Sequence, residues 1–277
     1  MRRRNRVRHL TDLLFLVWIG SMTGVALALL VVLAVTVAVQ GGSSFAAHGL
    51  TQGMVWRGVW RALGGSLKVV GTGAAIAVPI GLGAGFYLAE HGGLRLAGFI
   101  RATADGLAGV PSIVSGLIVF AAVVTAVHAF SPFAGGLALA TLLAPTLARA
   151  AEQALLALPH DLREGAWALG ATRAQTLLRV VVPTAGRELA QRVLLALSRS
   201  MGETAPLLFT VLGASGLAHG RAASDAALPL AVFVGALSGH QAAREQAWGA
   251  GLALLAVVFA LRVGARLIGR AGAGDAA

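Results

Sequence analysis

The sequence contains no cysteine and a single lysine among its 277 residues. The absence of cysteine excludes a disulfide framework, a thiolate metal site and a cysteine nucleophile. The one lysine, Lys68, is followed by Val69, so the chain has no GxxxxGK[ST] phosphate loop and any ATP must be hydrolysed by another chain. None of the seven histidines opens an HExxH sequence, which argues against a zinc protease.

Charged residues are also scarce, at 12% of the chain, whereas 57% of the residues are hydrophobic. This apolar content exceeds what one soluble core needs and indicates a polytopic membrane protein. The formal net charge of +11 comes almost entirely from arginines that are scattered among the apolar runs rather than gathered with aromatic residues. The charge therefore favours a role in membrane topology over nucleic-acid binding, and we expect membrane lipid as a partner and no nucleic acid.

Six apolar runs are long enough to cross about 30 Å of hydrocarbon, which takes roughly 20 helical residues. They cover residues 13–39, 66–89, 108–128, 133–151, 192–213 and 246–268. Sixteen of the 22 basic residues fall at the two ends of the chain and around the loops that follow the second and fourth runs. Because basic residues concentrate on the cytoplasmic side, both termini and the loop after the fourth run are predicted to be cytoplasmic.

Two shorter features bear on packing within the membrane. Gly81 and Gly85 form a GxxxG pair in the second run, with Gly83 between them, so a neighbouring helix could approach closely there. The segment 228–237 is apolar but too short to cross, and we expect it to be re-entrant or interfacial.

The polar stretch EGAWALGATRAQTLLRVVVP begins at Glu164, between the fourth and fifth runs. Irregular backbone is not tolerated in contact with lipid tails, so this stretch is expected to lie outside the bilayer and to dock on another molecule. Asp161 is expected to cap a first short helix, with Glu164 three residues on, and Thr172 with Gln175 forms a capping box for a second. Gly170 separates the two, so the sequence predicts a short helix, a glycine bend and another helix.

Arg199 and Glu203 lie four residues apart in LSRSMGETAPLLF, within the fifth apolar run. On a continuous helix they would share one face and could pair. A charge at a helix centre costs about 2.5 to 3.5 kcal/mol on the insertion scale, so such residues normally face a bundle interior or a water-filled path. We therefore expect Arg199, Glu203 and Thr204 to line a substrate path, with Pro206 weakening the helix beside them. A buried ion pair that only orients helices is the alternative.

The stretch from Glu164 resembles the EAA loop of ABC importer permeases. Its frame is occupied by Glu164, Ala166, Gly170, Val180, Val182 and Pro183, with Gly165 in place of one alanine. The strings GVPSIVSGL, from Gly109, and GETAPLLF, from Gly202, accompany it in the same order and spacing. Together the three resemble the PstA-type permease subunits of phosphate ABC importers. In that resemblance the residues coupled to an ATPase are Glu164, Gly165, Ala166, Leu169, Gly170, Ala171 and Pro183.

This resemblance implies an all-α integral membrane protein with six transmembrane helices and the type I ABC importer permease (MetI-like) fold, in a bacterial inner membrane. The expected organisation is a basic tail (1–12), a first transmembrane helix with an external loop (13–63), a permease domain (64–270) that contains the coupling loop 161–183, and a short tail (271–277).

The resemblance also implies inward transport of inorganic phosphate. It implies three kinds of partner: a second permease of the PstC type, a cytoplasmic ATPase dimer of the PstB type that holds ATP and Mg, and a phosphate-binding protein of the PstS type. The chain itself is expected to hold no catalytic residue, metal or cofactor.

Three alternatives remain. The chain could serve an importer for another oxyanion. It could be an ion-coupled secondary transporter that uses Arg199 and Glu203, although no internal repeat is visible. It could be an intramembrane serine hydrolase, although the string from Gly213 to Gly216 is not a GxSxG elbow.

Overall fold

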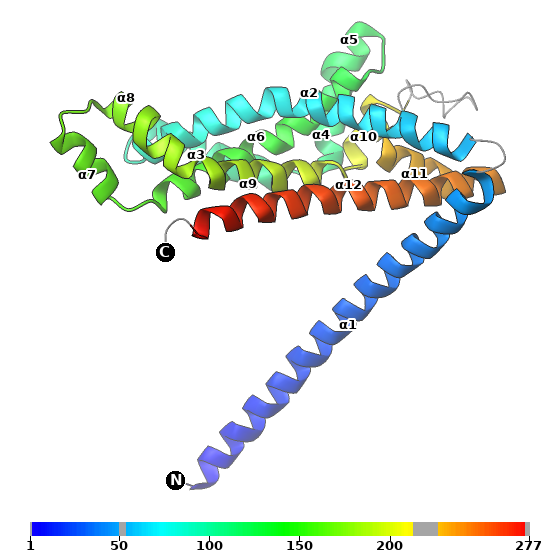
Figure 1. The fold of residues 1–277 in the computed structure, drawn as a ribbon, viewed down its shortest axis with the longest axis horizontal. Coiled ribbons are helices and arrows are strands. Elements are labelled where there is room, and N and C mark those ends of the chain that lie inside the picture. Colours follow the sequence, from blue (N-terminus) through cyan, green and yellow to red (C-terminus); the bar gives the residue numbers. More distant parts are fainter. Residues whose placement is uncertain (1, 50–53, 213–226, 275–277) are drawn as a thin grey trace.

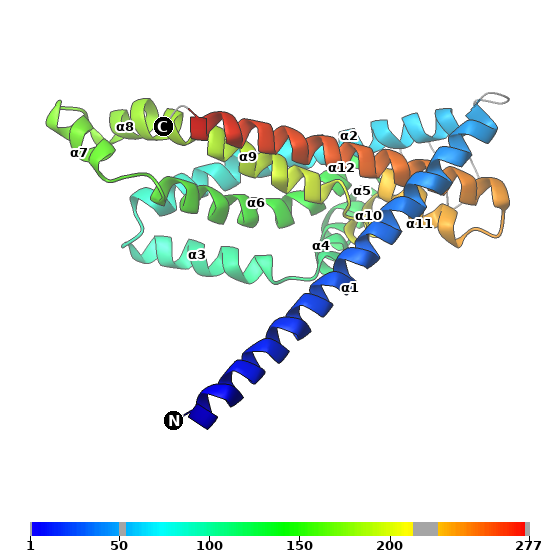
Figure 2. The same ribbon diagram turned by 60° about the horizontal axis from the view of Figure 1, so that its bottom comes forward.

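The computed structural model describes residues 2–49, 54–212 and 227–274, and within these ranges the chain is helical and contains no β-strand. Long helices lie side by side in a bundle (Figure 1). Helix α1 (Arg2–Gly49) meets the bundle at one end, and most of its length projects away from the other helices in both views (Figures 1 and 2). The short helices α7 (Asp161–Ala168) and α8 (Arg173–Thr176) lie at the opposite end of the bundle.

Four helices are long and apolar enough to cross a membrane, and they match the first, second, fourth and sixth predicted runs. They lie in α1, in α2 (Met54–Glu90), in α6 (Pro132–Leu156) and in α12 (Gln241–Gly274). A fifth span is possible if two helices separated by a bend of 101° are counted together. The first of these is α3 (Arg95–Ala108), and the second comprises α4 (Ser112–Val119), a π-helical turn η1 (Phe120–Val124) and α5 (Thr125–Val127).

The expectation of six transmembrane helices is not confirmed, because the described residues supply four such spans, or five with the bent pair. The third predicted run does not begin at 108 but at Ser112, because α3 ends at Ala108 and α4 starts only after Pro111. Proline disfavours helical geometry in the residue before it, here Val110. The fifth predicted run is interrupted. Helix α9 (Val182–Ser200) ends there, and α10 (Ala205–Thr210) begins only after a break at residues 201–204.

Helices α2 and α6 form the tightest seam in the bundle. A Cβ atom built on Gly81 would lie 2.8 Å from the carbonyl oxygen of Ala144, and one built on Gly85 would lie 2.7 Å from that of Ala148. Gly83, by contrast, has open space around it. The predicted close approach at the GxxxG pair is thus confirmed, and glycine is required because any side chain would force the helices apart. Residue numbers rise together along the seam, so α2 and α6 run parallel.

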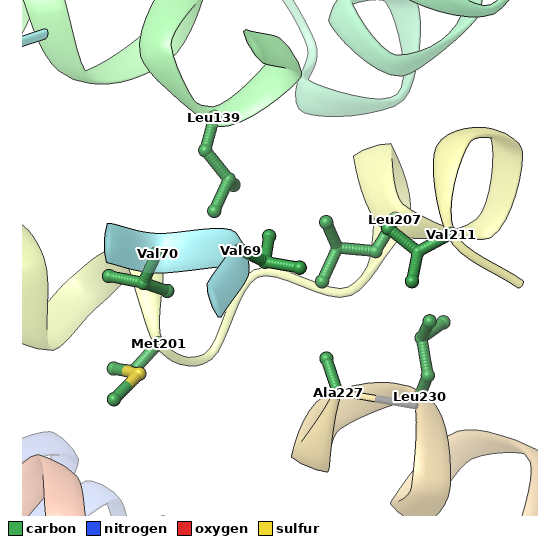
Figure 3. Packing of buried hydrophobic residues seen from close by; sticks show 8 residues of the cluster. All are labelled: Val69, Val70, Leu139, Met201, Leu207, Val211, Ala227 and Leu230. Atoms are coloured by element: carbon green, nitrogen blue, oxygen red, sulfur yellow. The ribbon is translucent and has the colours of Figure 1, made fainter. Parts of the chain in front are cut away.

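A central apolar cluster joins segments that are far apart in the sequence (Figure 3). It brings together residues of α2, of α6, of the break and α10, and of the chain entering α11 (Leu228–Leu237): Val69, Val70, Leu139, Met201, Leu207, Val211, Ala227 and Leu230. All eight are buried. The break in the fifth predicted run is therefore held in place by packing, since Met201 in the break and Leu207 in α10 are both core residues.

The apolar segment 228–237, which the sequence predicts to be too short to cross, forms one short helix, α11. The backbone N–H of Leu228 donates a hydrogen bond to the buried hydroxyl of Ser66, with a nitrogen–oxygen distance of 2.8 Å. Gly235 packs closely against Ala243 and Ala247 of α12. A helix of this length does not cross a bilayer, and its contacts with α2 and α12 provide the packing that holds it.

Candidate functional site

The segment 161–183 forms a short helix, a glycine bend and a second short helix, as predicted. Gly170 has a φ of 82°, a left-handed conformation that glycine adopts without steric cost. The N–H of Ala171 donates to the carbonyl of Ala166 at 3.0 Å, and the N–H of Gly170 donates to that of Trp167 at 2.9 Å. These two bonds are those of a Schellman motif, which satisfies the last carbonyls of α7 and ends it sharply.

The predicted capping box at the second helix is confirmed. The Thr172 hydroxyl accepts from the Gln175 N–H, and the Gln175 side chain accepts from the Thr172 N–H. The predicted cap at the first helix is wrong, because His160 occupies the N-cap position and makes no side-chain capping bond. Asp161 instead lies in the first turn together with Glu164. Both carboxylates there interact favourably with the positive end of the helix dipole.

The segment has an inner and an outer face. Leu169 is 90% exposed, and Glu164, Gly165 and Gly170 are exposed as well. Ala166, which the resemblance places among the residues coupled to an ATPase, is buried. Ala166 and Arg163, three residues apart, form the buried face of α7, whereas Leu169 lies at the C-cap, where the helix ends.

Pro183, the last predicted coupling residue, is exposed near the start of α9. It lines an open groove of about 550 Å³ between the beginning of α9 and the end of α12, where Gln191 and Gly269 also contribute. This shared groove places the carboxyl end of α12 at the same end of the bundle as segment 161–183.

An ion pair that sequence reasoning missed joins α7 to α2. The guanidinium Nη2 of Arg163 donates to Oε1 of Glu90 at 2.9 Å. The Arg163 side chain is only 9% exposed and that of Glu90 21%. A signal was present in the sequence, since Glu90 is the single acidic residue at the end of a long apolar run, but nothing in the spacing pointed to its partner 73 residues away.

A second missed cluster lies between α3 and α6. Glu152, with its side chain 3% exposed, accepts hydrogen bonds from Arg101 at 3.0 and 2.5 Å and is also paired with Arg149. Arg149 in turn reaches Asp105 at 2.9 Å. The spacing of Arg149 and Glu152, three residues apart in an otherwise apolar helix, was the available signal. The two arginines compensate the charge of Glu152, which permits burial of its carboxylate.

Arg199 and Glu203 do not share one face of a continuous helix. Arg199 lies in the last turn of α9, whereas Glu203 lies in the break, because the N–H of Gly202 turns back to the Arg199 carbonyl and ends the helix. Nε of Arg199 is 3.9 Å from Oε1 of Glu203. Arg199 is 80% exposed and Glu203 25%. An exposed pair at this distance contributes little to stability, so the geometry disfavours a purely structural role for it.

Thr204 and the signature strings surround the same break. Thr204 occupies the position before α10, and its hydroxyl donates a long bond of 3.4 Å to the Gly202 carbonyl. Gly116 of α4 packs directly on the backbone of Pro206, where an added Cβ would lie 2.8 Å from the Pro206 carbonyl oxygen. The strings GVPSIVSGL and GETAPLLF, 90 positions apart at these two residues, are thus in direct contact.

The strings also connect to α6. The Ser115 hydroxyl donates to the Ala138 carbonyl at 2.9 Å and lies against the Thr141 hydroxyl. The N–H of Ser131 donates to the Thr210 carbonyl at 3.1 Å. Among the residues that the structure describes, no group of three His, Asp or Glu side chains is placed to hold a metal ion.

Residues 77–271 match the family model described as binding-protein-dependent transport system inner membrane component, and the chain belongs to that family. With its apolar helices, this makes it a multi-pass inner membrane component of an ABC-type transporter.

Its relatives narrow the class further. It is 38% identical over 216 residues to phosphate transport system permease protein PstA 1 of Mycobacterium tuberculosis, covering 76% of this chain and 70% of the relative. It is 40% identical over 212 residues to phosphate transport system permease protein PstA of Haemophilus influenzae, covering 76% and 75%. The probable phosphate transport system permease protein PstA of Methanocaldococcus jannaschii is 29% identical over 93% of both chains.

A solved structure shows the fold. A chain of the methionine ABC transporter MetNI in an inward-facing conformation superposes with a TM-score of 0.61 at 23% identity, covering 80% of this chain and 99% of that one. The protein therefore has the all-α, MetI-like permease fold.

Proposed function

We propose that this chain is the permease subunit of an ATP-driven importer of inorganic phosphate and forms half of its translocation path. The substrate is supported by the names of the relatives, which are phosphate transport permeases. The structural observation that carries the proposal is Arg199, an exposed cation held at the break between α9 and α10. An exposed guanidinium within a membrane protein is suited to attract an oxyanion, because its planar donors match the oxygens of phosphate.

In the proposed path, Arg199 supplies the attractive charge and Glu203 keeps the empty site near neutrality. Their separation of 3.9 Å is too long for a tight, bidentate pair, so the donors of Arg199 remain available to a ligand. The Thr204 hydroxyl adds a neutral donor beside them. Pairing with Glu203 weakens the binding of phosphate to Arg199, so that the anion can leave the site as well as enter it.

The proposed partners follow from the family. They are a second permease of the PstC type, an ATPase dimer of the PstB type and a phosphate-binding protein of the PstS type. ATP and Mg would be bound by the ATPase, since this chain has no phosphate loop, and the chain would be no enzyme by itself. The exposed residues Glu164, Gly165, Leu169, Gly170 and Pro183 would form the surface on which the ATPase docks, with Ala166 and Ala171 behind it.

We further propose that segment 161–183 and both termini face the cytoplasm. The groove shared by Gln191 and Gly269 supports a common side for the segment and the carboxyl end of α12. The excess of basic residues on that side supports its assignment as cytoplasmic.

The test is phosphate uptake by proteoliposomes that contain the assembled complex at matched subunit levels. Arg199→Gln is expected to abolish uptake while assembly survives, because the attractive charge is lost. Exchanging the pair, as Arg199→Glu with Glu203→Arg, keeps the charge sum but moves the positive group from the last turn of α9 into the break at residues 201–204. The exchanged protein is expected to assemble and to transport poorly.

A matched control is available on the same helix. Arg192 and Glu188 form an ion pair of the same type at 2.6 Å, also four residues apart. Exchanging that pair is expected to leave uptake near normal. Near-normal uptake after the exchange of Arg199 and Glu203 would refute their place in the path.

The same preparation separates the alternatives. Inhibition of uptake by sulfate as strong as that by unlabelled phosphate would favour an importer for another oxyanion. Uptake that persists without the ATPase and follows an ion gradient would favour a secondary transporter.

A further inference from the structure

Helix α7 packs mainly within its own segment. Its neighbours of substantial contact are α8 and the π-helical turn η2 (Leu177–Val181), both of which belong to 161–183. The side chain of Arg163 extends from this helix to the end of α2, where it meets Glu90. A docked ATPase that displaces α7 would therefore act on α2 through this pair of side chains.

The pair has the properties of a rigid link. Arg163 is buried, and its Nε has no hydrogen-bond partner, so the guanidinium is held by Glu90 without full compensation. Separating the two would leave an unpaired charge in a poorly solvated place, which is strongly unfavourable. Helices α7 and α2 are thus expected to move together rather than slide past each other.

From Glu90, a series of close packing contacts runs along α2. Helix α2 is fixed against α6 at Gly81 and Gly85, where the backbones touch. Val70 lies about 30 Å from Glu90 along α2, at 1.5 Å per residue, and belongs to the cluster that contains Met201. Met201 forms the break that follows Arg199 (Figure 3). The link at Glu90 therefore leads, through one helix, to the proposed substrate path.

A second route also exists. Leu177 and Val181 of η2 pack against the end of α6 in an apolar cluster, so movement of segment 161–183 can reach α9 along the chain itself. Leu82, Phe86 and Ala89 of α2 pack against the same cluster, so this second route reaches α2 through apolar contacts rather than through an ion pair. The two routes make different predictions, because only one of them depends on the charges of Arg163 and Glu90.

We propose that Arg163 and Glu90 are positioning residues that transmit movement of α7 to α2, so that ATP hydrolysis is tied to opening of the path at Met201. This proposal rests on the docking role proposed above for segment 161–183. It assigns the pair a part in coupling, distinct from both ATPase docking and phosphate binding.

The test measures phosphate transported per ATP hydrolysed in proteoliposomes that hold the full complex and the phosphate-binding protein. Glu90→Gln and Arg163→Gln are each expected to lower this ratio at least tenfold while ATP hydrolysis continues, because the ATPase still docks at Leu169 but no longer moves α2. The exchange of Glu90→Arg with Arg163→Glu restores an opposite pair and is expected to recover much of the ratio. Arg192→Gln, a neutralised arginine of the α9 ion pair, is the matched control and should leave the ratio unchanged.

Single variants with a normal ratio would overturn the proposal. An exchanged protein that assembles but still transports little phosphate per ATP would also overturn it. If the single variants do not assemble, an exchanged protein that does not assemble either would overturn it as well. Leu169→Arg distinguishes failure of the docking role, since it should release the ATPase from the complex. If Leu169→Arg retains the ATPase, the docking proposal fails; if it releases the ATPase while the Glu90 and Arg163 variants stay coupled, only the link fails.

Discussion

Replacing Gly170 by valine tests whether the bend of segment 161–183 is needed for ATPase docking. A Cβ atom at Gly170 would meet nothing within 4 Å, so the cost of the substitution is confined to the backbone. With φ at 82°, a residue with a side chain loses about 1–2 kcal/mol, and a β-branched residue is at the upper end. An energy of this size changes a local equilibrium by about 5- to 30-fold. The bent form would be depleted by that factor.

The assay is ATP hydrolysis by the permease complex as the ATPase subunit is titrated in. Gly170→Val is expected to raise the half-saturating ATPase concentration by about 5- to 30-fold, following the same backbone energy. Gly186→Ala is the matched control, because Gly186 also has open space around it but lies inside α9. There alanine should stabilise the helix by about 0.5–1 kcal/mol and leave docking unchanged. Equal half-saturating concentrations for Gly170→Val and the parent chain would refute the requirement for the bend.

Three further predictions follow from the packing and the charges. Gly85→Leu should prevent α2 and α6 from meeting and abolish the monodisperse, folded protein in size-exclusion chromatography, whereas Gly83→Leu, in open space, should be tolerated. Glu152→Ala should lower the thermal unfolding temperature in detergent, because it removes the buried carboxylate that accepts both hydrogen bonds from Arg101 and pairs with Arg149; an unchanged temperature would contradict this. A cysteine at Arg173 in this otherwise cysteine-free chain should resist an impermeant thiol reagent in intact cells, and labelling there would overturn the proposed orientation.

The sequence predicted the elements that depend on local chemistry. The capping box at Thr172 and the bend at Gly170 appear where they were expected, because turn and cap preferences are set by a few neighbouring residues. The close approach at Gly85 was also predictable, since small residues spaced four apart mark a helix contact in membranes.

What the sequence could not provide depends on distant partners. Hydropathy placed residues 192–213 in one span, yet the chain breaks after Ser200 because Met201 is drawn into a core built from α2, α6 and α11. The partner of Arg163 was equally hidden, since no spacing rule links it to Glu90. The roles of Arg199 and Glu203 in transport, and of segment 161–183 in docking, stay predictions.

The parallel arrangement of α2 and α6 has a consequence for biosynthesis. The two helices with the tightest seam are separated by α3, α4 and α5, and a parallel pair requires the intervening chain to return to the starting side. The seam at Gly81 and Gly85 therefore cannot close until α6 has been synthesised and inserted. Until then the glycine face of α2 lies against lipid, which leaves it open to pairing with the wrong helix. Slowing translation after residue 132 should thus reduce the yield of folded protein more than the same delay placed after α6.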